Sequence, residues 1–233
     1  LVREFGVIRE TFLAEFWRHL LLSFSSATLA ILPGVLLGYL CWRRPRVREW
    51  ILGAVNVFQV APTLSLLGLL MIPLTFLALT FPALAAVGIR GVGFAPAFIV
   101  LFLYCLLPIT ANALAGFTQV DRDILDSATA MGMEERQILA RIAFPLALPL
   151  IFSGIRTALT QNIGNTILAG LIGGGGMGAL IFLGLSQSAT DLVILGTLPV
   201  VVLALGADSI LHWFENKLRT RMGVSNDPMD GRI

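Results

Sequence analysis

The stretch VDRDILDSATAMGMEERQILARIAFPLALP, residues 120–149, is the longest polar interruption in an otherwise apolar chain. In its first half, apolar residues recur every three or four positions, which is the spacing of one helix face. They are Ile124, Leu125, Ala128 and Met131. Gly132 stands where a left-handed helix cap would be needed, and Glu134 and Glu135 then fall in the first turn of a second helix. The stretch predicts two short helices around a glycine, which form an elbow between two hydrophobic spans.

Composition places this elbow in a membrane protein. Of the 233 residues, 57% are hydrophobic and only 13% are charged, which is too little polar sequence for a soluble domain of this size. The formal net charge is only +2, and the basic residues are confined to chain ends and loops, so we expect no nucleic-acid partner. Cys41 and Cys105 both lie in apolar runs, which indicates inert thiols and no metal site.

The elbow also carries a resemblance. The motif residues share one fixed spacing, and they are Asp126, Ser127, Ala128, Gly132, Ile142, Phe144 and Pro145. They resemble the EAA loop of binding-protein-dependent ABC importer permeases, with Asp for Glu, Ser for Ala and Phe for Leu. Each replacement keeps charge, small size or apolar character. The resemblance implies that these residues form the coupling helix that docks in a cleft of an ATPase subunit. Amphipathicity alone would also allow an ordinary interfacial loop.

Hydropathy divides the rest of the chain into spans and connections. Residues 1–18 alternate charged and apolar side chains at helical spacing, which predicts an interfacial amphipathic helix before a transmembrane permease domain over 19–217 and a cytoplasmic tail over 218–233. About five transmembrane helices are expected in this all-α protein. They cover 19–42, 50–72, 95–117, 146–172 and 192–214, with the coupling loop (118–145) between spans three and four. We expect an outer loop at 73–94 and a glycine-rich turn or hinge at 173–178. The segments 74–87 and 179–185 are expected to be either re-entrant or short external apolar helices.

The distribution of basic residues sets the expected orientation. Five spans put the two chain ends on opposite sides, and an outside N-terminus leaves most basic residues in the cytoplasm. The inside set is Arg43, Arg44, Arg46, Arg48, Arg122, Arg136, Arg141, Lys217, Arg219 and Arg221. The predicted topology is N-out and C-in, in a bacterial cytoplasmic (inner) membrane. The elbow then lies in the cytoplasm, independently of the resemblance.

Polar residues inside the spans indicate a translocation path. Such groups are costly against lipid, so they should face protein or water. The candidates are Gln59, Pro62, Gln161, Asn162, Asn165 and Thr166. The last four form two i, i+4 pairs, and interhelical hydrogen bonding is the alternative to path lining. Arg156 and Asp208 lie at similar depth, and they either form an ion pair or extend separately toward the interface.

The chain offers no sign of catalysis. Its single lysine, Lys217, follows Glu215 and Asn216 rather than a phosphate-binding glycine loop, and no nucleophile–base set appears. We therefore expect no enzyme and no cofactor on this chain, with ATP and magnesium bound by a partner ATPase dimer. Intramembrane acids for a gradient-driven carrier are limited to Asp208, and a structural scaffold would leave the polar span unexplained.

The resemblance extends over about residues 20–214. The stretches 56–68, 103–117, 145–158 and 172–185 resemble permeases of osmoprotectant ABC importers. The resemblance implies uptake of glycine betaine, choline, carnitine or related quaternary amines. It also implies a second permease subunit and a separate periplasmic or lipid-tethered solute-binding protein, with membrane lipid around the spans. Amino acids or organosulfur compounds are the alternative solutes. Because the polar faces of span four lack aromatic side chains, we expect the selectivity for the cation to lie in the receptor.

Overall fold

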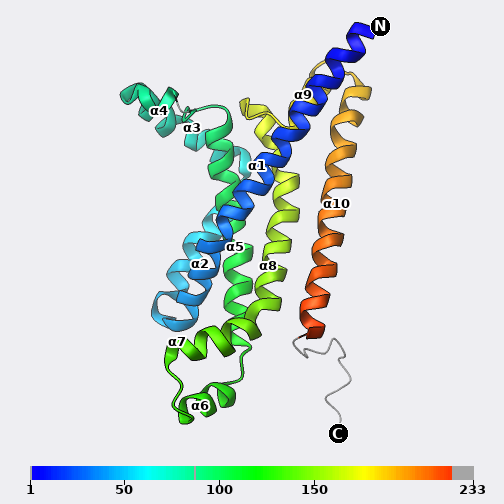
Figure 1. Ribbon diagram of the computed structural model, residues 1–233. Helices are drawn as coiled ribbons and strands as arrows, with labels where there is room; N and C mark the ends of the chain where they lie inside the picture. The colour runs from blue at the N-terminus through cyan, green and yellow to red at the C-terminus, as the bar shows by residue number, and fades with distance from the viewer. Residues whose placement is uncertain (1, 87, 222–233) are drawn as a thin grey trace.

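The computed structural model describes residues 2–86 and 88–221, and the side chains of residues 10–86, 88–218 and 220. Every regular element in that part of the chain is helical (Figure 1). The elements are α1 (Val2–Arg43), α2 (Pro45–Val60), α3 (Thr63–Thr80), α4 (Pro82–Ala86), α5 (Phe94–Thr118), α6 (Arg122–Ala130), α7 (Glu135–Ile138), a π-helical turn (Leu139–Ala143), α8 (Phe144–Asn165), a 3₁₀ segment (Thr166–Ile172), α9 (Met177–Ser186) and α10 (Thr190–Arg221).

Five helical segments are long and apolar enough to cross a membrane. They are Glu10–Arg43, Thr63–Thr80, Phe94–Thr118, Glu135–Ile172 and Thr190–Leu218. This confirms the predicted class, an all-helical protein with five spans. The third, fourth and fifth spans agree closely with the sequence prediction, and α9 corresponds to the expected short outer helix.

The N-terminal segment continues directly into the first span. Val2–Arg43 is one uninterrupted helix, so the predicted amphipathic segment over 1–18 shares its axis with span one. Placement of that segment at an interface stays a prediction. The predicted tail over 218–233 begins inside α10, and residues 222–233 lie outside the described residues.

The prediction of a second span over 50–72 is wrong at its centre. Ala61 takes an extended backbone, with φ −65° and ψ 131°, and separates α2 from α3. The ring of Pro62 disfavours helical geometry in the preceding residue, which explains the break. The helix resumes at Thr63 and passes through Pro73, so the boundary expected there, and the short helix expected over 74–87, are also wrong. Thr63–Thr80 is the second candidate span instead.

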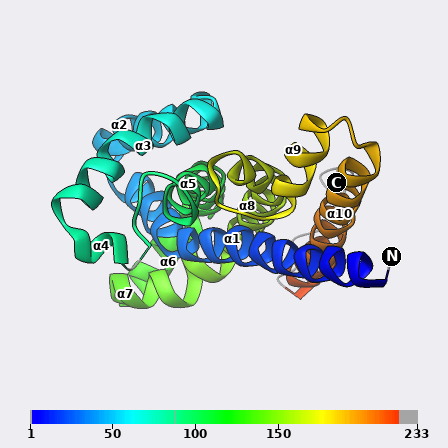
Figure 2. The same ribbon diagram turned by 90° about the horizontal axis from the view of Figure 1, so that it is seen from above.

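Helices α1, α5 and α8 form the centre of the bundle. Seen from above, α1 crosses beside α5 and α8, while α3 and α4 extend away from them (Figure 2). Close approach of α1 to α5 depends on two glycines one helical turn apart. A Cβ atom on Gly34 would lie 2.7 Å from Ile109, and one on Gly38 would lie 2.5 Å from Ala113. The small residues at 34 and 38 therefore allow close helix packing.

The elbow lies at one end of the bundle. Helices α6 and α7 are at the lower end in Figure 1, together with the turn between α1 and α2 and the end of α10. The start of α1 and helix α9 are at the opposite end. The segments that contain most of the basic residues therefore gather on the side of the elbow.

Candidate coupling elbow and translocation path

The first helix of the elbow is fixed by a cap at each end. At its start, the Asp121 carboxylate accepts a hydrogen bond from the Asp123 N–H at 3.0 Å. At its end, Gly132 has φ +81° and donates its N–H to the carbonyl of Thr129 at 2.9 Å. This confirms the predicted left-handed cap, a conformation that glycine adopts without steric cost.

The second helix leads into span four through a widened turn. The Glu134 N–H donates to the Gln137 side chain at 3.1 Å, which completes one half of a capping box. Residues Leu139–Ala143 then form a π-helical turn, in which the Phe144 N–H reaches the carbonyl of Leu139. Pro145 follows in the first turn of α8. The helical run continues through it, and the candidate span Glu135–Ile172 begins before it.

The motif residues present a mixed surface on the elbow. Asp126 and Ser127 are exposed, whereas Ala128 is 1% exposed and anchors α6. Two of the apolar residues predicted to share one helix face are not buried, because Ile124 is exposed and Met131 is 75% exposed. Of the remaining motif residues, Phe144 is exposed, while Ile142 and Pro145 are half-buried. The tip of the elbow thus exposes acidic and apolar side chains next to one another in the sequence.

The elbow is also tied to the end of α1. Arg43 forms an ion pair with Glu135 at 2.7 Å, with the two side chains 44% and 79% exposed. Leu125 and Leu139 of the elbow pack near Phe117, beside Tyr39 and Trp42 of α1. The rings of Trp42 and Phe117 stack with centroids 5.4 Å apart. The elbow is therefore in direct contact with span one and span three.

Sequence reasoning missed this connection between the elbow and α1. The i, i+3 spacing of Tyr39 and Trp42 at the end of span one was an available signal, because it places two aromatic rings on one helix face. The pairing of Arg43 with Glu135 had no sequence signal, since the two residues are separated by 92 positions and lie among several other charges.

The structure brings together two of the predicted path residues. The Gln59 amide of α2 donates to the Gln161 side chain of α8 at 3.4 Å. Gln161 is exposed and Asn165, one turn further along, is half-buried. Pro62 is exposed at the break between α2 and α3 and makes no contact of this kind.

Asn162 and Thr166 have a different environment. Both are buried, and the Asn162 amide donates to the Ser23 carbonyl and the Ser26 hydroxyl of α1, each at 2.8 Å. The Thr166 hydroxyl donates to the Asn162 carbonyl within its own helix. In this conformation Asn162 serves the contact between α8 and α1, which is the alternative that the sequence left open, whereas the hydrogen bond of Thr166 stays within its own helical run.

The exposed polar side of α8 is therefore a narrow strip. Thr157, Gln161 and Gly164 are all exposed and follow one another at helical spacing, and Gln59 borders them from α2. Amide and hydroxyl groups at this depth are costly against hydrocarbon, so the strip requires water or protein beside it.

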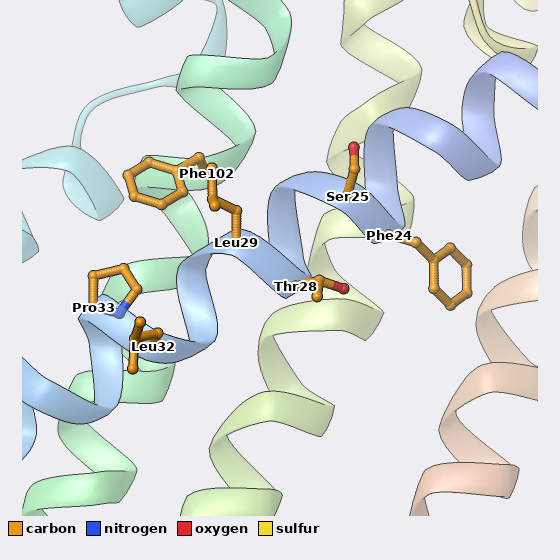
Figure 3. Close-up of a pocket in the computed structure, with 7 residues that line it drawn as sticks. All are labelled: Phe24, Ser25, Thr28, Leu29, Leu32, Pro33 and Phe102. Carbon is orange, nitrogen blue, oxygen red and sulfur yellow. The ribbon is translucent and has the colours of Figure 1, made fainter.

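A larger hollow on α1 has the opposite character. It encloses about 750 Å³ between α1 and Phe102 of α5, and its side chains lie along one face of α1 (Figure 3). Its lining is apolar apart from Ser25 and Thr28, and the Ser25 hydroxyl donates to the Leu21 carbonyl of its own helix. It offers a polar solute little to bind.

Helices α8 and α10 are joined by a charged network. Arg156 donates to both carboxylate oxygens of Asp208, at 2.8 and 3.0 Å, and to Glu215 at 3.0 Å. It also contacts Nδ1 of His212, while the Thr160 hydroxyl donates to Asp208. Of the two arrangements left open by the sequence, the ion pair is confirmed. Among the described residues, no group of three or more His, Cys, Asp or Glu side chains is placed to hold a metal ion.

A five-span bundle with a polar strip and a short-helix elbow at one end has the architecture of a membrane permease. The chain belongs to the family described as binding-protein-dependent transport system inner membrane component, whose model matches residues 30–220. It is thus a multi-pass protein of the bacterial inner membrane and a transport subunit of the ABC importer class.

Curated relatives cover most of the chain. The carnitine transport permease protein OpuCD of Listeria monocytogenes is 36% identical over 88% of this chain and 85% of its own. The glycine betaine/carnitine/choline transport system permease protein OpuCD of Bacillus subtilis is 34% identical over 88% and 83%. The osmoprotectant import permease protein OsmW of Salmonella typhimurium is 37% identical over 84% and 86%.

A solved structure supports the same fold. An inward-facing form of the MetNI methionine ABC transporter superposes with a TM-score of 0.75 over 89% of this chain and 96% of that chain. Its sequence identity is 20%, so the likeness concerns the fold alone.

Proposed function

We propose that this chain is the permease subunit of an ATP-driven importer for quaternary-ammonium osmoprotectants such as glycine betaine, choline or carnitine. The observation that carries this proposal is the 34–37% identity, over more than four fifths of the chain, to permeases named for those solutes. The methionine named for the structural neighbour gives no comparable support, because that likeness is confined to the fold.

The strip on α8 is the proposed path for the solute. Gln161 of the strip and the neighbouring, half-buried Asn165 supply neutral hydrogen-bonding groups, and Gln59 approaches from α2. A second permease subunit facing this strip would convert it from a costly lipid-facing surface into the wall of a shared, water-filled path. Asn162 would support that wall from behind by holding α8 against α1, and the buried Thr166 lies one turn further along.

The elbow is the proposed docking site for an ATPase dimer, which would bind ATP and magnesium. Asp126, Ser127 and Met131 are exposed there, while Ala128 is buried. Because α7 is paired with α1 through Arg43 and continues into α8, closure of the ATPase dimer would tilt span one and span four together. The proposed orientation is N-out and C-in, with the elbow and the basic segments in the cytoplasm.

Uptake into proteoliposomes tests the proposed solute. The permease is reconstituted with its co-expressed ATPase and solute-binding protein, and uptake of glycine betaine, carnitine and choline is compared with that of methionine. The proposal expects ATP-dependent uptake of at least one quaternary amine and none of methionine. Uptake of methionine alone would show that the proposed solute is wrong, while the assignment to the ABC importer class would be unaffected.

Exchange of the receptor tests where selectivity lies. The polar strip offers no aromatic faces for a quaternary ammonium group, so it should pass related solutes without strong discrimination. With the permease held constant, receptor variants that prefer carnitine or glycine betaine should change the transported solute accordingly. A preference that ignored the receptor would place the selectivity in this chain.

A further inference from the structure

A cavity beside the elbow is lined by three arginines from three different helices. Arg43 ends α1, Arg48 lies in α2 and Arg122 begins α6, and all three contribute to one cavity of about 360 Å³. No carboxylate is among its lining residues. Positions 43, 48 and 122 are distant in sequence or separated by a helix boundary, so the fold itself brings these positive charges together.

The remaining lining residues of the cavity are mostly apolar, and we refer to them as the apolar wall. They include Leu114 and Val120, which are buried, together with Leu125 and Trp42. The cavity thus combines cationic side chains with a hydrocarbon surface. A ligand that suits both carries a compact anionic group attached to an apolar chain.

The depth of the cavity agrees with such a ligand. Arg43 and Thr118 are the last residues of their candidate spans, and Cys41 and Leu114 lie within one turn inside them. The cavity therefore extends across the level at which a hydrocarbon core gives way to lipid headgroups. Trp42 at the same level is typical of that boundary.

Only one of the three arginines has a strong internal partner. Arg43 pairs with Glu135, whereas within the described side chains neither Arg48 nor Arg122 forms an ion pair with a carboxylate. Both are exposed, and a guanidinium has five N–H donors suited to a phosphate. Their charges are available to an external anion.

We propose that this cavity binds a phosphate-type anion, and that the ligand is the headgroup phosphate of an anionic phospholipid. Arg48 and Arg122 hold the phosphate, Arg43 adds its remaining donors, and Leu114 and Leu125 contact the acyl chain. The alternative source of the same chemistry is a soluble phosphate, which would leave the apolar wall unused. A lipid bound here contacts α1, α5 and the elbow, so it bears on the connection between the elbow and the spans.

Trp42 provides a reporter inside the site. The full-length permease retains Trp42 as its single tryptophan once Trp17, Trp50 and Trp213, all exposed, are replaced by Phe. Its fluorescence is measured in vesicles that contain phosphatidylglycerol or phosphatidylcholine with brominated acyl chains, in matched mixtures. The ratio of the two association constants reports selection of the anionic lipid.

The proposal expects phosphatidylglycerol to quench Trp42 at a concentration roughly 25-fold lower than phosphatidylcholine, about fivefold from each of Arg48 and Arg122. Neutralising Arg48→Gln or Arg122→Gln should lower that preference about fivefold each, which corresponds to about 1 kcal/mol per basic residue. Arg46→Gln is the matched control, because Arg46 is exposed in the same turn and does not line the cavity. It should change the preference less than twofold.

Three outcomes overturn the lipid assignment. An equal response to both lipids, or an equal loss with Arg46→Gln, shows that only general surface charge acts. Reversal of the preference by inorganic phosphate at matched ionic strength assigns the arginines to a soluble anion. If Arg48→Gln with Arg122→Gln leaves lipid quenching intact but abolishes copurification of the ATPase, the arginines serve that partner. Unchanged thermal stability of each variant confirms that the fold is retained.

Discussion

Arg156 of α8 holds Asp208 of α10 through two hydrogen bonds, at 2.8 and 3.0 Å. The two side chains are 26% and 37% exposed, and the same guanidinium also reaches Glu215. Because α10 packs against α8 and α9 near one side of the bundle, this paired contact fixes the register of the last span against span four.

Removal of one member of the pair should destabilise the protein. Asp208→Asn leaves Arg156 with a weaker partner inside a span, and we expect a cost of about 2 kcal/mol, between the values for exposed and buried pairs. Asp191→Asn, an exposed acid in the first turn of the same helix, is the control. Thermal denaturation in detergent should show a larger decrease in melting temperature for Asp208→Asn than for Asp191→Asn. Equal decreases would mean that the ion pair does not stabilise the fold.

The contact between α1 and α5 should be sensitive to side-chain size at Gly38. A Cβ there would lie 2.5 Å from Ala113 and 2.9 Å from the Thr110 carbonyl, so Gly38→Ala forces the helices apart at a cost of about 1 to 3 kcal/mol. Gly53→Ala in α2 meets no atom within 4 Å and should be neutral or stabilising. Melting temperatures of the two variants make the comparison, and a neutral Gly38→Ala would mean that the helices pack less closely.

Substitutions of Gly132 should be opposed by the backbone conformation rather than by lack of room for a side chain. A side chain there meets no atom within 4 Å, so only the left-handed backbone, with φ +81°, opposes substitution. Gly132→Val should lose ATPase-coupled transport while membrane insertion is retained, whereas Gly132→Asn should keep most activity because Asn tolerates this conformation. Uptake per inserted molecule is the measurement. Normal transport by the Val variant would speak against a rigid coupling elbow.

Two neighbouring amides of α8 should have separate roles. Asn162→Ala removes hydrogen bonds to Ser23 and Ser26 and should lower stability, by about 0.6 kcal/mol per contact on average within membranes. Gln161→Ala removes an exposed amide and should change the rate of transport with little effect on melting. Melting temperature and uptake are measured on both variants. If Asn162→Ala alone impairs transport and the protein remains stable, Asn162 rather than Gln161 lines the path.

The exposed pair of Arg43 and Glu135 should contribute little energy by itself. Ion pairs of this exposure are worth about 0 to 1 kcal/mol, so Arg43→Gln should shift the melting temperature only slightly. If the pair transmits motion of the elbow, the same variant should lower ATP hydrolysis stimulated by the loaded receptor. A restored response in the charge exchange Arg43→Glu with Glu135→Arg would identify the pair itself as the cause.

Much of this architecture could be predicted from local sequence. The lengths of the apolar segments predicted spans three to five correctly. The role of Gly132 in the elbow was predictable because a left-handed helix cap strongly prefers glycine. The second span was misjudged because hydropathy is continuous across Pro62, while the backbone of Ala61 responds to the proline ring rather than to hydropathy. The boundary expected at Pro73 was wrong for the opposite reason, because helix α3 continues through this proline.

The site was predictable only in part. Periodicity placed Gln161, Asn162 and Asn165 on α8, yet only tertiary packing determines that Asn162 meets Ser26 while Gln161 remains exposed. The meeting of Arg48 and Arg122 in one cavity likewise has no local signal, because it depends on how three helix ends converge.

ATP hydrolysis by the permease reconstituted with its ATPase and solute-binding protein tests the central claim most directly. We predict that the receptor loaded with glycine betaine, carnitine or choline stimulates hydrolysis, that the unloaded receptor does not, and that Gly132→Val abolishes the stimulation. Hydrolysis that is indifferent to every loaded receptor, or an ATPase that does not copurify with the intact elbow, would contradict an importer driven through residues 120–149.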